Sequence, residues 1–248
     1  MATSKEILQS MLDYWESTHE TDLEKVKFAG NPEADDLVKN NLFAFLMACS
    51  VDRTGNSELL FNIPYRLRQE WGHLDSREVR NMDAEELAKS SVIARAPSQV
   101  GPLSLAKTII SLANVVENEF SGHPEGMLEG SLSDILDNLE LVYGVGPNIA
   151  RMTVILRMQY FGLVPLRAGR LIPKIDVHVQ RVFTRTGLVD ECTEHAVRNV
   201  LKGYDTKDVA SIDQVCWGVG RSHCSETDPE CDSCPLTSVC AKVGVNVS

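Results

Sequence analysis

The chain has 248 residues, 43% of them hydrophobic, which is enough for one large or two small domains with a real core. Its longest apolar run, residues 42–51, is about half a membrane span, and no signal peptide is recognisable. We therefore expect neither membrane association nor secretion. The net charge of −11 argues against nucleic-acid binding over the whole surface, because such binding depends on Lys and Arg.

Apolar residues recur at the three- and four-residue spacing of helices, whereas the alternation typical of strands is scarce. Two clear examples are residues 109–116 and 149–160. Internal repeats and low-complexity linkers are absent from the sequence. The sequence thus predicts an all-α protein.

Residues 139–150 read LELVYGVGPNIA, with a predicted helix from about Ser133 before this tract and another helix after it. Gly144 and Gly146 permit the positive φ of a tight hairpin, and Pro147 suits the first position of the second helix. Backbone N–H groups at such a helix start form an anion site suited to a DNA phosphate. By itself the G-x-G pattern is a weak signal, since most such turns only connect helices.

Positive charge is concentrated in one strip of this acidic chain. Residues 147–185 hold seven basic residues and one acidic residue, a net charge of +6, so the rest of the chain carries −17. The basic residues are Arg151, Arg157, Arg167, Arg170, Lys174, Arg181 and Arg185. Such a strip can contact a nucleic-acid backbone locally, although charge on a helix surface without any partner is the alternative.

Asp176 is the single carboxylate within this strip. A lone carboxylate among basic and apolar residues is either a structural ion-pair partner or a functional charge. Cleavage of an N-glycosidic bond builds positive charge on the sugar, which a carboxylate beside the anomeric carbon stabilises while it orients or deprotonates water. Near a phosphate-binding hairpin, the functional interpretation of Asp176 is favoured.

Four of the seven cysteines form a C-x6-C-x2-C-x5-C run, namely Cys224, Cys231, Cys234 and Cys240. Two disulfides or four buried thiols are the alternatives, but the odd cysteine total and the absence of a signal peptide disfavour disulfides. The run therefore favours a metal site. The run could hold a four-iron cluster. Zinc sites usually pair two C-x2-C units, whereas this run has only one, and the spacing alone leaves the metal open.

Several segments of the sequence resemble those of a known protein family. The segment from Gly220 to Cys240, with its GR and CPL residues, is similar to the iron–sulfur loop of the endonuclease III and adenine glycosylase branch of the helix-hairpin-helix DNA glycosylases. The hairpin tract resembles the family's L-P-G-V-G, with Tyr143 in place of proline, and residues 175–182 resemble V-D-T-H-V-x-R-V. Residues 41–54 and 97–120 look like two barrel helices of that family, the second preceded by the Gly101-Pro102 break.

The resemblance implies two helical lobes with a cleft between them. One is a helical barrel lobe, residues 36–160, ending in the helix-hairpin-helix at about 133–160; the other is a cluster lobe, residues 1–35 with 161–248, containing the iron–sulfur loop 224–240. It implies catalysis by Asp176 and a [4Fe-4S] cluster on the four cysteines. The implied DNA-binding residues are Gly144, Val145, Gly146, Asn148, Arg151, His178 and Arg181.

Three departures from the family qualify these expectations. Bifunctional members carry a nucleophilic lysine where this chain has Asn148, and an amide cannot form the Schiff base that leads to strand cleavage. Residues 160–174 look like an inserted loop, either a wall of the lesion pocket or a packing element. Residues 225–230 carry three acids where basic phosphate contacts are expected, which favours a purely structural metal.

The leading hypothesis is a monofunctional base-excision-repair DNA glycosylase that acts as a monomer on double-stranded DNA with a damaged or mismatched base. Such an enzyme would lie in the cytoplasm, associated with the nucleoid, or in the nucleus. The alternatives are a non-catalytic lesion-sensing iron–sulfur protein, and a bifunctional glycosylase and lyase that uses another lysine such as Lys174. An electron-transfer protein ranks last, because it needs neither the hairpin nor Asp176.

Overall fold

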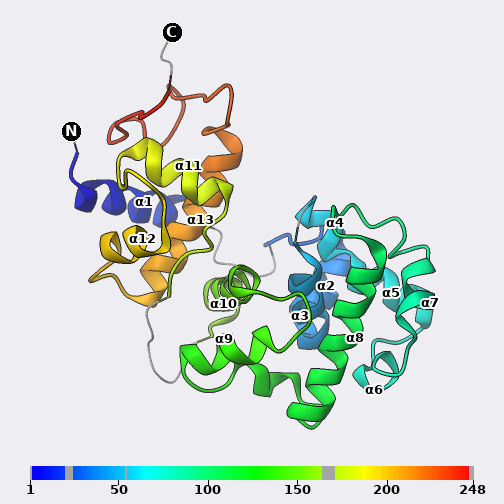
Figure 1. Cartoon of the computed structure of the whole chain (residues 1–248). Coiled ribbons are helices and arrows are strands. Elements are labelled where there is room, and N and C mark those ends of the chain that lie inside the picture. Colours follow the sequence, from blue (N-terminus) through cyan, green and yellow to red (C-terminus); the bar gives the residue numbers. More distant parts are fainter. Residues whose placement is uncertain (1, 20–24, 54, 164–170, 246–248) are drawn as a thin grey trace. The chain divides into compact units, whose positions relative to one another are not determined.

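The computed structural model describes residues 2–19, 25–53, 55–163 and 171–245 (Figure 1). These residues are mainly helical, and the described part contains no β-strand, only an isolated bridge between Gly55 and Ser98. The predicted all-α fold is confirmed. The described residues divide into two compact units, one of residues 25–154 and one of residues 2–19, 155–163 and 171–245.

The unit of residues 25–154 is built round one apolar helix, α3. This unit contains α2 (Pro32–Asn40), α3 (Leu42–Val51), α4 (Ser57–Phe61), α5 (Ile63–Trp71), α6 (Ser76–Val79), α7 (Ala84–Lys89), α8 (Pro102–Glu119), the 3-10 helix η1 (Pro124–Leu128), α9 (Leu132–Glu140) and the start of α10 (Pro147–Phe161). Residues 43–51 of α3 are all buried, as expected of a helix that is apolar on every face. It packs against α2, α4, α5, α8 and η1.

Helix starts in this unit follow the capping chemistry of the sequence. Asn31 caps α2 and Asn41 caps α3 through side-chain oxygens that accept backbone N–H groups. Ser131 and Asp134 form a reciprocal capping box at α9, which fixes where the first helix of the predicted hairpin begins. The break at Gly101 and Pro102 starts α8 at the proline, so that helix is shorter than the expected 97–120.

The second unit is centred on α13 (Thr206–Ser222), which packs against α1 (Ser4–Thr18) and α11 (Val177–Thr186). This unit also holds α12 (Glu194–Val200) and the remainder of α10. Ten residues of α13 are buried, and the buried residues of α1 are Ile7, Leu8 and Met11. Beyond α13, residues 224–245 contain turns but no helix, and Leu236 is their one buried residue.

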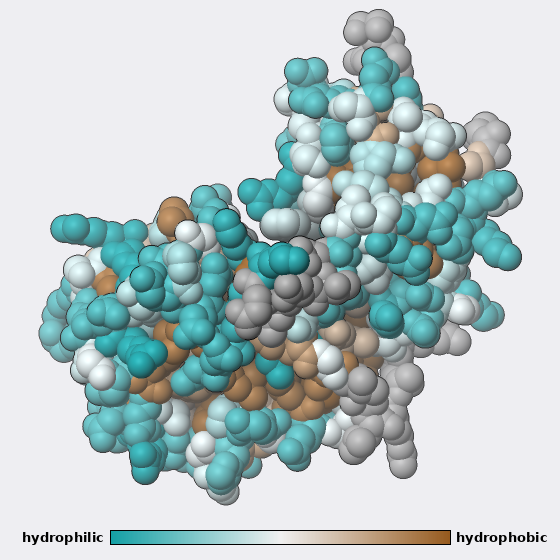
Figure 2. Space-filling view, turned by 180° about the vertical axis from the view of Figure 1, so that it is seen from behind, coloured by the Kyte–Doolittle hydropathy of each residue, from teal (hydrophilic) through white to brown (hydrophobic). Residues whose placement is uncertain are grey.

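Hydrophilic residues cover most of the face of the molecule shown in Figure 2, in keeping with the acidic composition. Among the described helices, none combines the length and the apolar character that crossing a bilayer requires.

Candidate functional site

The predicted hairpin connects α9 to α10, and α10 begins at Pro147 as expected. Gly144 has φ +81°, which an L side chain rarely adopts. Gly146 does not use the positive φ that a glycine permits, so within the turn Gly144 alone of these two adopts it. Between them Val145 is buried, and its N–H donates to the Val142 carbonyl at 3.0 Å, which closes the turn.

The hairpin presents backbone donors at the start of α10. Within the described residues, nothing accepts a hydrogen bond from the N–H of Gly144, Gly146 or Asn148. Asn148 is exposed, and Arg151 one turn later is partly exposed. Unused N–H groups at the positive end of a helix can bind an anion such as a phosphate.

Arg53, from the turn after α3, fixes this hairpin and was not identified as a site residue from the sequence. Its guanidinium donates to the Tyr143 carbonyl at 3.2 Å and to Ser104 Oγ at 3.2 Å, and it also hydrogen-bonds Thr108. A Cβ added at Gly144 would overlap this guanidinium. Gly144 is thus required both by its backbone angle and by its contact with Arg53. Burial lowers the pKa of Arg53, but a guanidinium keeps its charge at neutral pH.

Asp176 lies in the other unit and caps α11. Its Oδ1 accepts the N–H groups of His178 at 2.9 Å and of Val179 at 3.0 Å, which explains locally why the helix begins there. Its Oδ2 lies 3.8 Å from Lys174 Nζ, and the Asp176 side chain is 19% exposed. One oxygen is therefore held by the backbone, while the other faces a cation in a side chain that is partly exposed.

A second carboxylate, Asp213 of α13, lies beside residues 174–176. No sequence motif singled it out. It is buried, and its Oδ1 accepts the backbone N–H of Lys174 at 2.8 Å. Burial, and then the charge of Asp176, raise the pKa of Asp213 to about 7. A buried aspartate in a helix gives no periodic signal that distinguishes it from a surface charge, so only the structure identifies it.

His178 and Arg181 occupy the contact between α11 and α13. Arg181 donates to the carbonyls of Gly220, at 2.8 Å, and of Cys224, and lies 3.1 Å from His178 Nδ1. Burial lowers the pKa of His178, against the opposing charge of Asp176, which favours a neutral ring at pH 7. The observed contacts of Arg181 hold the cysteine loop, and its predicted contact with DNA stays a prediction.

Gly220 allows this close helix contact, and its replacement should be costly. A Cβ at Gly220 would lie 2.7 Å from the Cβ of His178, whereas a Cβ at Gly218 would meet nothing within 4 Å. We expect Gly220→Ala to lower the free energy of unfolding by about 1–3 kcal/mol through overpacking. Gly218→Ala, the control in the same helix, should leave it unchanged or raise it by up to about 1 kcal/mol. Chemical denaturation measures both, and equal effects would contradict the assigned contact.

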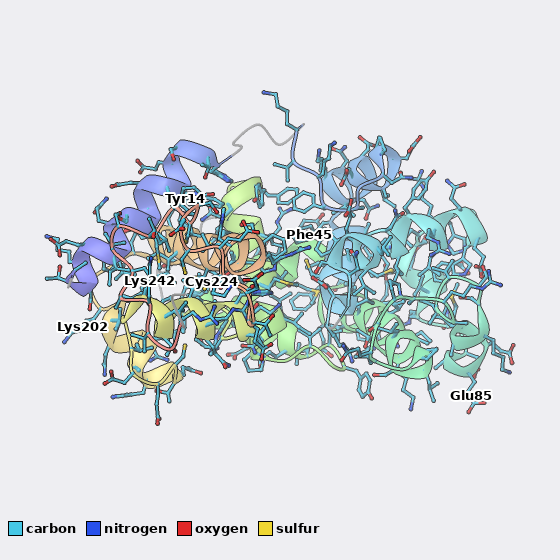
Figure 3. All side chains as sticks on the ribbon, turned by 90° about the horizontal axis from the view of Figure 1, so that it is seen from above. Tyr14, Phe45, Glu85, Lys202, Cys224 and Lys242 are labelled. Carbon is cyan, nitrogen blue, oxygen red and sulfur yellow. The ribbon has the colours of Figure 1, made fainter. Side chains whose placement is uncertain are left out.

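The four cysteines of the run line one small cavity, together with Lys242. Cys224 and Lys242 are both labelled in Figure 3. Arg185 Nη1 donates to Cys224 Sγ at 3.4 Å, and the backbone N–H of Lys242 donates to Cys240 Sγ at 3.4 Å. Arg185 also binds the carbonyls of Ser225 and Glu226, so it ties α11 to the loop.

Four thiols are the donor set that a four-iron cluster binds. Among the residues that the structure describes, no three His, Cys, Asp or Glu side chains are grouped so as to hold one metal ion. In a four-iron cluster each thiolate binds a different iron, so the sulfurs surround a cavity instead of converging on one point. Burial raises the pKa of Cys234 and of Cys240, and a buried thiolate there needs a compensating cation.

The other cysteines lie outside this cavity. Cys49 and Cys216 are buried within α3 and α13, as expected of small apolar side chains. Cys192 lies in the loop between α11 and α12 and is only partly buried, although its sequence context is apolar and predicts a helix.

The basic strip is partly used for internal contacts. The guanidinium carbon of Arg157 lies 4.3 Å from the centre of the Phe161 ring, and Arg181 and Arg185 bind carbonyls of the cysteine loop. Arg167 and Arg170, with most of the expected insertion at 160–174, fall outside the described residues. The net charge of this strip therefore overstates the number of cations that the described structure presents to a partner.

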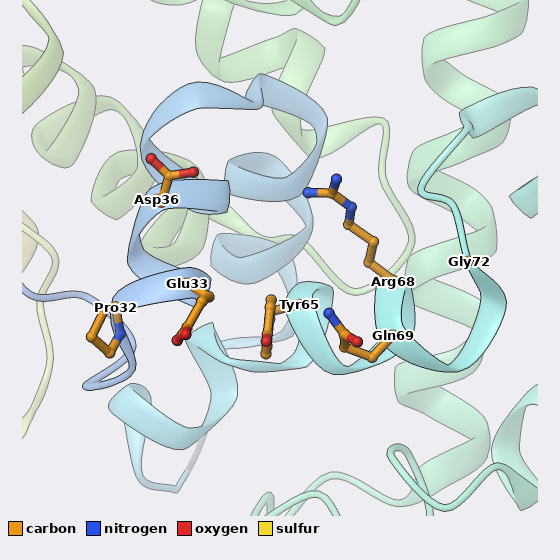
Figure 4. Close-up of a pocket in the computed structure, with 7 residues that line it drawn as sticks. All are labelled: Pro32, Glu33, Asp36, Tyr65, Arg68, Gln69 and Gly72. Carbon is orange, nitrogen blue, oxygen red and sulfur yellow. The ribbon is translucent and has the colours of Figure 1, made fainter.

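A surface hollow of about 600 Å³ lies between α2 and α5 (Figure 4). Glu33, Asp36 and Arg68 are among its lining residues. It holds none of the residues that the sequence motifs single out.

No protein-family model matches the chain, and no curated protein is similar to it in sequence. Solved structures do match. A trapped covalent complex of endonuclease III with DNA superposes with a TM-score of 0.67 at 20% identity, covering 98% of this chain and 97% of that one. The chain has the endonuclease III fold. A non-covalent endonuclease III–DNA complex gives a TM-score of 0.66 at 21% identity, with the same coverage.

A thermostable thymine-DNA glycosylase also shares the fold, with a TM-score of 0.62 at 14% identity over 96% of this chain and 95% of that one. The fold expected from the sequence motifs is thereby confirmed over nearly the whole chain. At these identities the endonuclease III fold is what the similarity establishes, and chemistry has to be argued from the residues of this chain.

Proposed function

We propose that this protein is a monofunctional DNA glycosylase that hydrolyses the N-glycosidic bond of a damaged or mismatched base in double-stranded DNA. The observation that carries the proposal is the partly exposed Asp176 at the start of α11, in a chain with the endonuclease III fold. The unused N–H groups of the hairpin support it, because they suit a DNA phosphate.

The base must leave the stack before its glycosidic carbon can be reached, at a cost of a few kcal/mol that is smallest at damaged or mismatched pairs. Backbone donors at Gly144, Gly146 and Asn148 then hold the phosphate chain without reading sequence. Asp176 stabilises the positive charge that develops on the sugar and orients the attacking water through Oδ2. The hydrogen bonds to Oδ1 keep that carboxylate in place during the reaction.

Strand cleavage is not expected in this mechanism. Asn148 stands in the first turn of α10 with an amide that cannot form a Schiff base. The product is therefore an intact abasic strand, which breaks only on treatment with alkali or heat.

One observation favours a second candidate, a bifunctional glycosylase and lyase. Lys174 carries an amine 3.8 Å from Asp176 Oδ2, beside the carboxylate assigned to catalysis. Its ammonium could be deprotonated there and attack the sugar, which would give covalent chemistry from a different position of the chain.

The experiment that tests the function is a panel of duplexes, each with one lesion or mismatch. The panel includes uracil or thymine opposite guanine, adenine opposite 8-oxoguanine and oxidised pyrimidines, assayed with and without alkali. Base release with alkali-dependent breakage supports the proposal, and breakage without alkali together with borohydride trapping supports the Lys174 candidate. Binding without release from any duplex would identify a non-catalytic lesion sensor, for which the three acids of residues 225–230 are the motivation.

We further propose that Cys224, Cys231, Cys234 and Cys240 hold a [4Fe-4S] cluster. When bound, this group would cross-link a segment with too few buried residues to fold alone, and it takes no part in base release. The protein would act as a monomer at the DNA of the nucleoid or nucleus.

The hairpin proposal predicts a specific loss of DNA affinity in Gly146→Leu. Open space surrounds a Cβ at Gly146, so the protein should fold normally, but a bulky side chain would block the approach of a phosphate. We expect affinity for a duplex with a tetrahydrofuran abasic analogue to fall about tenfold or more for every flanking sequence, since backbone contacts carry no sequence information. Fluorescence anisotropy at low and high salt would measure it, and affinity should fall steeply with salt.

The matched control is Gly101→Leu, which is also open within 4 Å and lies in the same unit at the start of α8. Its affinity should equal that of the unmodified protein. Equal affinity of all three proteins would show that the hairpin does not bind the DNA backbone.

A further inference from the structure

Asp213 is a buried carboxylate that the reaction described above does not use. Its residue is 5% exposed and lies in the buried face of α13, near Ile212 and Cys216. Burying a carboxylate costs free energy unless hydrogen bonds compensate for the lost water. The hydrogen-bond partners of Asp213 therefore indicate which part of the chain it holds in place.

The partner of Asp213 is the backbone of the segment that carries Asp176. Asp213 Oδ1 accepts the N–H of Lys174 at 2.8 Å, and the carbonyl of Lys174 accepts the N–H of Asp176 at 2.8 Å. The side chain of Lys174 then reaches back to Asp176 Oδ2 at 3.8 Å. Residues 171–176 are not helical, so few other backbone bonds fix the position of this segment. Gln214 Nε2 also hydrogen-bonds Asp213, at 3.5 Å from its Oδ2.

We propose that Asp213 is a positioning residue for base release, which anchors the Lys174–Asp176 segment to α13 and changes the charge beside Asp176 when it ionises. The proposal rests on the proposed function, in which Asp176 is the catalytic carboxylate.

The charges round Asp213 determine how this ionisation behaves. Burial, and then the negative charge of Asp176, raise the pKa of Asp213 to about 7, while the Lys174 N–H and ammonium oppose this rise. Cys216, in the next turn of α13, keeps its proton because burial raises its pKa well above the ordinary value. The buried side chains of α1, the helix packed on the same element, are apolar.

Two protonation states follow for the segment. Below pH 7 Asp213 is neutral, and Lys174 faces the negative charge of Asp176. Above pH 7 Asp213 is ionised, and a second negative charge strengthens both the bond from the Lys174 N–H and the electrostatic stabilisation of a cationic sugar. Base release should therefore rise, by up to about tenfold, as the pH passes through about 7.

Stability should change in the opposite sense. The folded protein holds the Asp213 proton more tightly than the unfolded chain, whose carboxyl has the ordinary value of 3.8. Stability is therefore lost as the pH rises from about 4 to about 7, since deprotonation of Asp213 is harder in the folded state. Asp213→Asn should remove this loss.

The test compares Asp213→Asn and Asp213→Leu in single-turnover base release from pH 5.5 to 9, on the panel duplex that the unmodified protein cleaves fastest. Asn keeps an acceptor for the Lys174 N–H but cannot ionise, so release should persist without the step near pH 7. Leu removes the acceptor, so release should fall at least about tenfold at every pH while affinity for the tetrahydrofuran duplex is retained. Asp190→Asn, at an exposed position after α11, should keep both the rate and the step.

Amide hydrogen exchange of residues 171–176 gives a readout that does not depend on activity. Exchange at Lys174 should accelerate in Asp213→Leu but not in Asp213→Asn. An unchanged pH step in Asp213→Asn, or unchanged exchange in Asp213→Leu, would overturn the positioning role. If the unmodified protein releases no base from any duplex, the proposed function fails and the positioning role with it, while exchange still reports whether the anchor exists.

Discussion

Asp176→Asn should reduce base release by about a thousandfold or more, a loss of about 4 kcal/mol of transition-state stabilisation. The substitution keeps the shape of the side chain and removes its charge. Because Asn caps helices as well as Asp does, its side-chain oxygen can still accept the N–H groups of His178 and Val179. The loss of activity would then result from the removed charge and not from a disturbed start of α11.

Affinity for the tetrahydrofuran duplex should stay largely unchanged in this variant, since the proposed backbone contacts come from the hairpin. The matched control is Asp83→Asn, which changes an aspartate that caps α7 in the same way and should retain full activity. Activity of Asp176→Asn within tenfold of the unmodified protein would assign the chemistry to another group. Borohydride trapping that disappears in Lys174→Gln would identify that group as the Lys174 amine.

The sequence predicted the parts of this protein that depend on local pattern. Helical periodicity placed α10, and the proline at position 147 fixed its start. The cysteine spacing indicated a common site, and the structure places all four cysteines round one cavity. These features need only short-range geometry, which the chain order determines.

Features that depend on tertiary contacts were missed or misjudged. Arg53 is 90 residues from Tyr143, whose carbonyl it binds, and its position after an apolar helix looks like that of an ordinary turn residue. The sequence singled out Arg181 and Arg185 as members of a charge strip, and it did not indicate their contacts with carbonyls of Cys224, Ser225 and Glu226. Charge alone cannot distinguish a cation that will bind a phosphate from one that will satisfy buried carbonyls.

Asp213 shows that the sequence also does not distinguish a buried acid from a surface acid. The net charge of −11 counts it with the surface carboxylates, although it is buried and its pKa is about 7. Its role depends on Lys174, 39 residues earlier, and no pattern along the sequence links the two positions.

The other large effect should come from removal of a cysteine of the run. Purified without oxygen, the protein should be brown and contain about four irons and four labile sulfides per chain. Cys234→Ser should lose this iron and give insoluble or unfolded protein. Residues 224–245 bury only Leu236, and total stabilities of about 5–15 kcal/mol do not survive the loss of a structural metal site that contributes energy on that scale.

The contacts of the loop explain why the damage should spread beyond it. Arg181 and Arg185 of α11 donate to loop carbonyls, and the N–H of Val243 donates to the Arg185 carbonyl at 3.0 Å. If the loop detaches, two guanidinium groups on α11 lose their acceptors in a partly buried setting. Cys192→Ser, which changes a thiol outside the cavity, should keep full iron content and solubility. Stoichiometric zinc without iron in the unmodified protein, or full iron in Cys234→Ser, would contradict the assignment of the four cysteines to an iron–sulfur cluster.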